Sequence, residues 1–188
     1  MIDKDNYLIE LKNLKITETD LNNLRNMVDE LSDYWITFEP DNKPADFDPL
    51  WKGKEFYSPK FNWGCWLKYP NILEHPQVKE IISRLPSEIN VRSCSVMKSP
   101  PGFHLKPHQD PRNGSFLIVL TPNASPVYFL ESDDTLILEH EYTCPTVINT
   151  HVRHGSNNQS DSDRITFQLG IVQPWEDIVR ILKSSGLA

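Results

Sequence analysis

The spacing of hydrophobic positions changes along this chain, from a helical period before residue 90 to short alternating segments after it. In the first part, apolar residues recur every three or four positions in two segments, which predicts helices over about 20–34 and 76–85. Thr17 or Thr19 is available as the N-cap of the first helix, and Pro76 suits the first turn of the second. The apolar stripe of the first helix is formed by Leu21, Leu24, Val28 and Leu31.

After residue 90 the pattern becomes a series of short apolar segments separated by turn residues such as SPPG, DPRNG and TPNAS. It predicts strands near 91–98, 104–109, 115–121, 126–131, 135–139, 145–150 and 164–172. Seven or eight short strands with such breaks are typical of a sandwich or a jelly roll, the architecture of cupins. A last helical stripe over 175–183 predicts a helix that docks on the outside of the sheet. The expected fold class is therefore mainly β with flanking helices.

The length of 188 residues predicts a single domain. We expect a helical and aromatic-rich N-terminal part (1–90) that packs on a β-rich core (91–172), followed by a C-terminal helix (173–188). Between the two N-terminal helices, the stretch LWKGKEFYSPKFNWGCW contains six aromatic residues: Trp51, Phe56, Tyr57, Phe61, Trp63 and Trp66. These rings either cover one face of the sheet, which is the preferred interpretation, or line a substrate cleft.

The composition of the chain excludes several classes of partner. The formal net charge is −7, so neither a nucleic acid nor an anionic membrane surface is expected, because both require a basic face. No apolar segment approaches the roughly 20 residues of a membrane span, and the first residues lack the layout of a signal peptide. Three separated cysteines without a C-x-x-C motif indicate reduced thiols, which predicts a soluble cytoplasmic protein.

Candidate metal ligands lie at the end of one predicted strand. His108 and Asp110 are two positions apart, so in an extended segment their side chains point to the same side. Imidazole and carboxylate together suit divalent iron, manganese or zinc. A third ligand has to come from another segment, where His151 and His154 are both available. We favour His154, in the loop before the last strand, because it lies ten residues before Arg164.

Arg164 begins a strand in which polar and apolar residues alternate. Arg164, Thr166 and Gln168 would face the interior of a barrel, while the alternate residues Ile165, Phe167 and Leu169 pack against covering helices. An arginine binds a carboxylate through two parallel hydrogen bonds, and the hydroxyl of Thr166 can contribute another. The alternative is a strand-edge arginine paired with Asp161 or Asp163.

These residues resemble the Fe(II)- and 2-oxoglutarate-dependent dioxygenases over about residues 91–172. The resemblance implies a double-stranded β-helix in which His108, Asp110 and His154 bind iron. It assigns Arg164 to the far carboxylate of the co-substrate 2-oxoglutarate, with Thr166 as a helper. It also implies that O2 is consumed, that 2-oxoglutarate becomes succinate and CO2, and that the substrate is hydroxylated.

Within this superfamily, HQDPRN and VINTHVRHGSNNQSDSDRITFQLG are most similar to the aspartyl/asparaginyl β-hydroxylases, which implies an amino-acid or peptidyl substrate of the Asp/Asn type. Asp110 departs from the animal members, which lack the carboxylate ligand. The basic residue that this branch carries soon after its first ligand has only Arg112 as a nearby candidate. Prolyl hydroxylases share the triad and a basic residue at similar spacing, and they are the alternative.

Three residues close in sequence to the iron ligands are candidates for contacts with substrate or co-substrate: Lys98, His104 and Arg112. The expected partner is a small molecule or a peptide. An alternative from another class is a jelly-roll module that binds a metal or a small ligand without redox chemistry. A zinc hydrolase is the third alternative, and it ranks last because no general base stands out beside the ligands.

Overall fold

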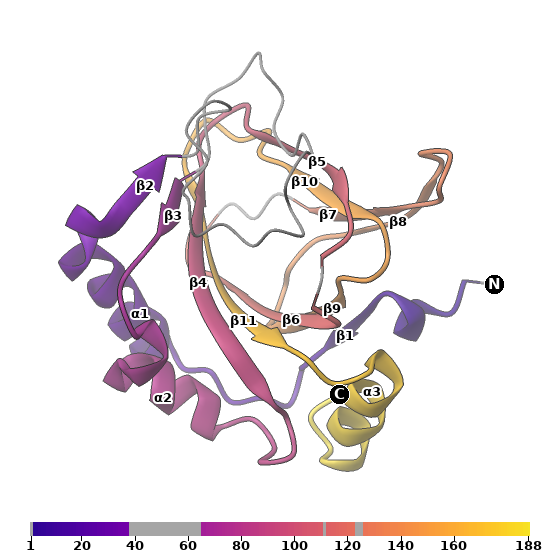
Figure 1. Ribbon diagram of the computed structural model, residues 1–188, viewed down its shortest axis with the longest axis horizontal. Coiled ribbons are helices and arrows are strands. Elements are labelled where there is room, and N and C mark those ends of the chain that lie inside the picture. Colours follow the sequence, from indigo (N-terminus) through magenta and orange to yellow (C-terminus); the bar gives the residue numbers. More distant parts are fainter. Residues whose placement is uncertain (1, 38–64, 111, 123–125) are drawn as a thin grey trace.

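The computed structural model describes residues 2–37, 65–110, 112–122 and 126–188. Its strands are β1 (Leu8–Glu10), β2 (Trp35–Thr37), β3 (Cys65–Leu67), β4 (Val91–Ser99), β5 (His104–His108), β6 (Gly114–Val119), β7 (Val127–Leu130), β8 (Leu136–His140), β9 (Thr146–Asn149), β10 (His154–Asn157) and β11 (Arg164–Ile171). Among the described residues they form a seven-stranded sheet, in the order β1-β9-β6-β11-β4-β3-β2, and a four-stranded sheet, in the order β5-β10-β7-β8. The two antiparallel sheets face each other (Figure 1), which confirms the jelly roll expected from the sequence.

All seven predicted strands of the β-rich core are present, with ends within two residues of those expected. The structure adds β10, where the sequence predicted a loop. It also adds three short strands from the N-terminal part, since β1 pairs with β9 and β3 joins β4 to β2. A strand of three residues is too short for its hydrophobic alternation to be visible in the sequence.

The helices are α1 (Glu18–Glu30), α2 (Pro76–Ser83) and α3 (Trp175–Ser184), with short 3-10 turns at Lys4–Asn6, Ser32–Tyr34 and Ile72–Glu74. Thr17 is the N-cap of α1 and forms a reciprocal capping box with Asp20. The guanidinium of Arg84, which follows α2, donates to both carboxylate oxygens of Asp20 at 2.6 and 2.7 Å. These bonds join the two helices. No helix in the described part of the chain is long and apolar enough to cross a membrane.

The helices cover the outer face of the large sheet (Figure 1). Phe167 and Leu169 of β11 are fully buried in the same cluster as apolar residues of all three helices, as the alternation in this strand predicted. At Gly114 of β6, a Cβ atom would lie 2.8 Å from Cδ1 of Ile178, so α3 packs directly on this strand. The inner face of the large sheet is therefore left to face the small sheet across a cavity.

Candidate metal centre and its cavity

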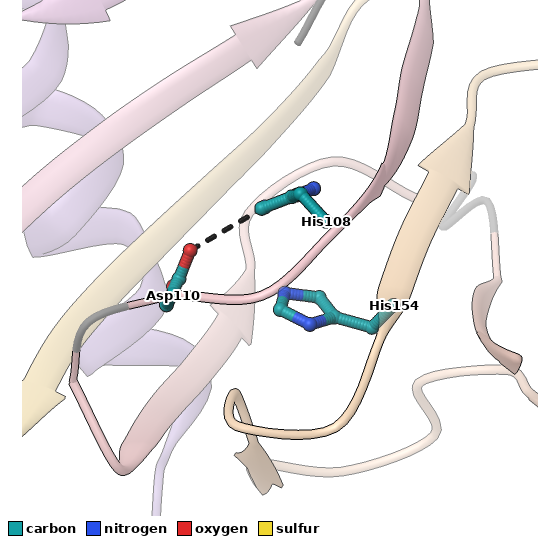
Figure 2. Close-up of side chains that lie close together, drawn as sticks. All are labelled: His108, Asp110 and His154. Atoms are coloured by element: carbon teal, nitrogen blue, oxygen red, sulfur yellow. Dashed lines mark ion pairs between the residues drawn. The ribbon is translucent and has the colours of Figure 1, made fainter. Parts of the chain in front are cut away.

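Three residues with metal-binding side chains converge between the two sheets. His108 ends β5, Asp110 follows it in the next turn, and His154 begins β10, where it pairs directly with His108. One ligand atom from each of the three lies within 4.8 Å of the others, and the two imidazole rings are 4.5 Å apart between centroids (Figure 2). His108 Nε2 is 3.4 Å from Asp110 Oδ1. His154 is thus on a strand and not in the loop expected from the sequence.

Backbone hydrogen bonds fix the turn that carries Asp110. Its amide donates to the carbonyl of Thr150 at 2.8 Å, and the Thr150 hydroxyl donates to the carbonyl of Arg112 at 2.6 Å. The Nδ1–H group of His154 donates to the carbonyl of Val152 at 2.8 Å, which leaves Nε2 as the nitrogen available to a metal. His151, the other candidate for the distal position, is exposed.

The protonation states of Asp110 and His154, which are both buried, suit metal binding. Burial alone would raise the pKa of the Asp110 carboxyl, but the hydrogen bond from His108 and the charge of Arg112 outweigh it and hold the pKa below its usual range. Burial and the neighbouring His108 lower the pKa of His154 to about 4. At neutral pH the site therefore offers a carboxylate and a neutral imidazole, which are the forms that coordinate a cation.

A cavity of about 760 Å³ extends from these ligands between the sheets. Arg164 lies at one end of it with only 3% of its surface exposed, and its guanidinium carbon is 5.3 Å from the centre of the Tyr142 ring. Arg164 Nε forms no hydrogen bond with any described residue, and Arg164 is not paired with Asp161 or Asp163. The hydroxyl of Thr166 is likewise buried without a partner among the described residues. Both groups are available to an anion.

Burial shifts the pKa values at this end of the cavity but leaves the charge of Arg164 in place. It lowers the pKa of Arg164 and raises the pKa of Tyr142 to about 12. An arginine in a protein remains protonated, so a cation is held here without a carboxylate partner among the described residues. Tyr142 was not identified from the sequence, where it belongs to a turn segment, EHEYTC, with no pattern that marks it as buried.

The other expected contacts divide into one that reaches the cavity and two that do not. Arg112 lines the cavity, and its Nε donates to Asp110 Oδ2 at 2.9 Å. Lys98 does not line the cavity, and its Nζ lies 5.0 Å from the centre of the Trp35 ring. His104 is also absent from the lining, and its Nε2 is 2.6 Å from the hydroxyl of Tyr128. Lys98 and His104 therefore have no contact with the cavity that supports the role expected for them.

A bulge explains the position of His104. In the β5–β10 pair, His108 is opposite His154 but Leu105 is opposite Ser156, so β5 has one residue more than β10. Leu105 and Ser156 both line the cavity. The side chain of His104 therefore points to the opposite face of the small sheet from that of Leu105, since successive side chains in a strand alternate.

Of the clustered aromatic residues, Trp66 lines the cavity. The other five lie outside the described residues: Trp51, Phe56, Tyr57, Phe61 and Trp63. The interpretation of this segment as a cover for the sheet or as part of a cleft therefore stays a prediction.

No protein-family model matches the sequence, and no curated protein matches it. Solved structures share the fold. A prolyl hydroxylase from Trichoplax adhaerens, in complex with a hypoxia inducible factor oxygen degradation domain peptide fragment, is 12% identical with a TM-score of 0.57, over 95% of this chain and 87% of that one. AviO1 from Streptomyces viridochromogenes Tue57 is 10% identical with a TM-score of 0.56, over 90% of each chain. A viral collagen prolyl hydroxylase from Paramecium Bursaria Chlorella virus-1, as a 2OG complex, is 12% identical with a TM-score of 0.50, over 88% of this chain and 95% of that one. At these identities the likeness shows a common jelly-roll fold.

Proposed function

We propose that this protein is a non-haem Fe(II)- and 2-oxoglutarate-dependent dioxygenase that hydroxylates an amino-acid or peptidyl side chain. One observation carries the proposal: a His-Asp-His group and a buried arginine without a carboxylate partner among the described residues line the same cavity. A metal site alone fits many functions. The arginine adds a second requirement, for an acid that enters the cavity beside the metal.

The donor set fits iron. His108, Asp110 and His154 would hold Fe(II) as two imidazoles and one carboxylate, a ligand set that leaves coordination positions open for other molecules. Because Val152 fixes the His154 ring and Arg112 holds the second oxygen of Asp110, two of the three ligands are oriented before a metal binds.

The opposite end of the cavity fits the far carboxylate of 2-oxoglutarate. Arg164 would bind it through two charge-assisted hydrogen bonds, and the hydroxyl of Thr166 would add a third. Tyr142 borders the same position. The acid would thereby supply the partners that these buried groups lack among the described residues.

When bound, iron and 2-oxoglutarate supply the oxidative chemistry, in which O2 is consumed, succinate and CO2 are released and one oxygen atom is transferred to the substrate. The chain itself orients the co-substrate through Arg164 and Thr166. Apolar side chains of Leu117, Val127 and Ile148 line the cavity between the sheets and exclude water from it.

The substrate type follows from the motif resemblance, which favours an aspartyl or asparaginyl side chain. A prolyl side chain is the alternative, and the likeness in fold is equally compatible with it. One of the similar structures is bound to a peptide, which supports a peptide as one form of the substrate.

The experiment is an anaerobic titration of the purified protein with Fe(II) and then 2-oxoglutarate, followed by admission of O2. We expect an absorption band that requires both additions, and succinate formation after O2 is admitted. A protein that binds the metal but gives neither the band nor succinate would instead be a jelly-roll module that binds a metal without redox chemistry.

A further inference from the structure

The cavity has a closed end and an open end. Along the inner face of β4, exposure increases from Met97, which is 3% exposed, through half-buried Ser95 to exposed Ser93. Arg164 lies beyond Met97 at the buried end, opposite Ser99 in the register. A co-substrate bound to Arg164 would therefore occupy the buried end, and among the described residues of β4 the Ser93 end is the more exposed one for a substrate.

Arg112 lies at this open end, where its side chain passes over Gly170 of β11. A Cβ atom on Gly170 would be 3.2 Å from both Cδ and Nη1 of Arg112, and 2.2 Å from Oγ of Ser93. The missing side chain of Gly170 is what leaves room for the arginine. Arg112 donates to Asp110 through Nε, whereas its Nη1 and Nη2 donate to no residue in the described part of the chain. Both terminal nitrogens of the guanidinium are thus left for a ligand.

Polar side chains surround the arginine on the inner face of the large sheet. Ser115 and Ser93 flank Gly170 on the neighbouring strands, and Gln168 lies between Leu117 and Ser95 in the next row. Ser115 is only 2% exposed, yet its hydroxyl has no hydrogen-bond partner among the described residues. The hydroxyl of Ser95 is also buried and has no partner among these residues. Buried hydroxyls without partners in a cavity indicate a missing polar ligand.

We propose that Arg112, Ser95, Ser115 and Gln168 form a second carboxylate subsite at the open end, and that the substrate is an acid whose carboxylate binds there. We refer to these four residues as the mouth subsite. The inference rests on the proposed function, because it assigns the Arg164 end to 2-oxoglutarate and leaves the mouth subsite to the substrate.

The charges of the cavity favour an acid. Asp110 has the only carboxylate among the described residues that line the cavity, whereas three of these residues carry a positive side chain: Lys68, Arg112 and Arg164. With a divalent cation and a doubly charged co-substrate in place, these groups leave at least one positive charge unbalanced. One carboxylate on the substrate balances it, although the chain as a whole carries a net charge of −7.

The position of Arg112 also limits the size of the acid. Its Nε is hydrogen-bonded to a candidate metal ligand, so a carboxylate on its Nη atoms lies close to the metal centre. The carbon that reacts has to lie within a few bonds of that carboxylate. Free amino acids and acidic side chains meet this condition.

The test measures binding and not turnover. The protein is loaded with Mn(II) and 2-oxoglutarate without O2, and calorimetry measures affinity for acids and their matched amides: aspartate and asparagine, glutamate and glutamine, and N-acetylated amino acids and their C-terminal amides. We expect at least one acid to bind about tenfold or more tightly than its amide, as a charge-assisted hydrogen bond implies. Arg112→Gln should remove this preference, and the exposed control Arg180→Gln on α3 should retain it.

A second variant keeps the test independent of Asp110. Gln168→Glu adds a negative charge to the mouth subsite without removing the bond between Arg112 and Asp110, and it should also weaken acid binding about tenfold. Were Arg112 only to position Asp110, Arg112→Gln would weaken Mn(II) binding and leave the preference for acids intact. That result would overturn the inference. So would equal binding of acids and amides by the wild-type protein, or no binding of any acid. Binding of 2-oxoglutarate to the wild-type protein is measured first. If the wild-type protein does not bind 2-oxoglutarate, this result contradicts the proposed function instead.

Discussion

Arg164→Met is the most informative single change, because it separates the cost of a buried charge from its use. The substitution replaces a guanidinium by an apolar side chain that fills much of the same space. In the protein without co-substrate, Arg164 is 3% exposed and its Nε has no hydrogen-bond partner among the described residues. Removing this charge removes a desolvation cost, so the free energy of unfolding should be unchanged or higher by about 1 kcal/mol.

The effect on 2-oxoglutarate should be large and of opposite sign. Two parallel bonds from Arg164 to a carboxylate, both charge-assisted and buried, contribute about 3 to 6 kcal/mol together, since one such bond contributes about 1.5 to 3 kcal/mol. Their loss corresponds to a rise in Kd of roughly 10² to 10⁴. Metal binding should change little, because Arg164 is not one of the three converging ligands.

Two measurements check this pair of effects. Anaerobic calorimetry of the Mn(II)-loaded protein gives the Kd for 2-oxoglutarate, and urea unfolding without co-substrate gives the stability. Arg180→Met, on the exposed side of α3, is the matched control and should behave like the wild type. A Kd for Arg164→Met within about threefold of the wild type would refute the role assigned to this arginine.

Four further changes, one of them paired with a control variant, test other parts of the structure. Thr166→Val should weaken 2-oxoglutarate about tenfold in the same calorimetric assay without lowering stability, because its buried hydroxyl has no partner to lose among the described residues. Asp110→Ala should abolish Mn(II) binding measured by electron paramagnetic resonance, whereas His151→Ala, at an exposed position, should retain it. Gly170→Ala should cost no more than about 1 kcal/mol in urea unfolding, because the atoms that its Cβ would meet, Ser93 Oγ and Arg112 Cδ and Nη1, belong to side chains that can shift, and a larger loss would contradict the packing described. Asp20→Ala should cost about 2 kcal/mol in the same assay, since it removes the capping box of α1 and both bonds from Arg84.

The strands and helices that could be predicted are those whose side chains alternate between a covered and an inner face. β11 is the clearest case, because Phe167 and Leu169 are fully buried under the helices while Thr166 and Gln168 face the cavity. β10 could not be predicted, because its sequence, HGSN, has no apolar alternation. In the sequence, Gly155 indicates a turn and not a strand. In the structure, a Cβ atom at this position would lie 2.6 Å from the Tyr128 hydroxyl. The glycine makes room for a side chain that crosses the strand.

The candidate site divides in the same way. The ligand positions and Arg164 could be named from the sequence because spacing along one strand and across one loop places them. Tyr142 and the hydroxyl of Ser115 could not, because they reach the cavity through pairings between distant segments. Arg112 was named for its nearness to Asp110, but its position at the open end depends on Gly170, 58 residues later.

The direction of the His104 side chain and the convergence of His108 with His154 have one cause. If the pairing of Leu105 with Ser156 continued without a bulge, Pro107 would lie opposite His154, and His108 would point away from the cavity. The extra residue in β5 reverses this and sets His108 opposite His154. Among the described residues β5 is an edge strand of the small sheet, where a proline such as Pro107 and a bulge are both tolerated. The bulge therefore turns an irregular edge into the feature that assembles the candidate metal centre.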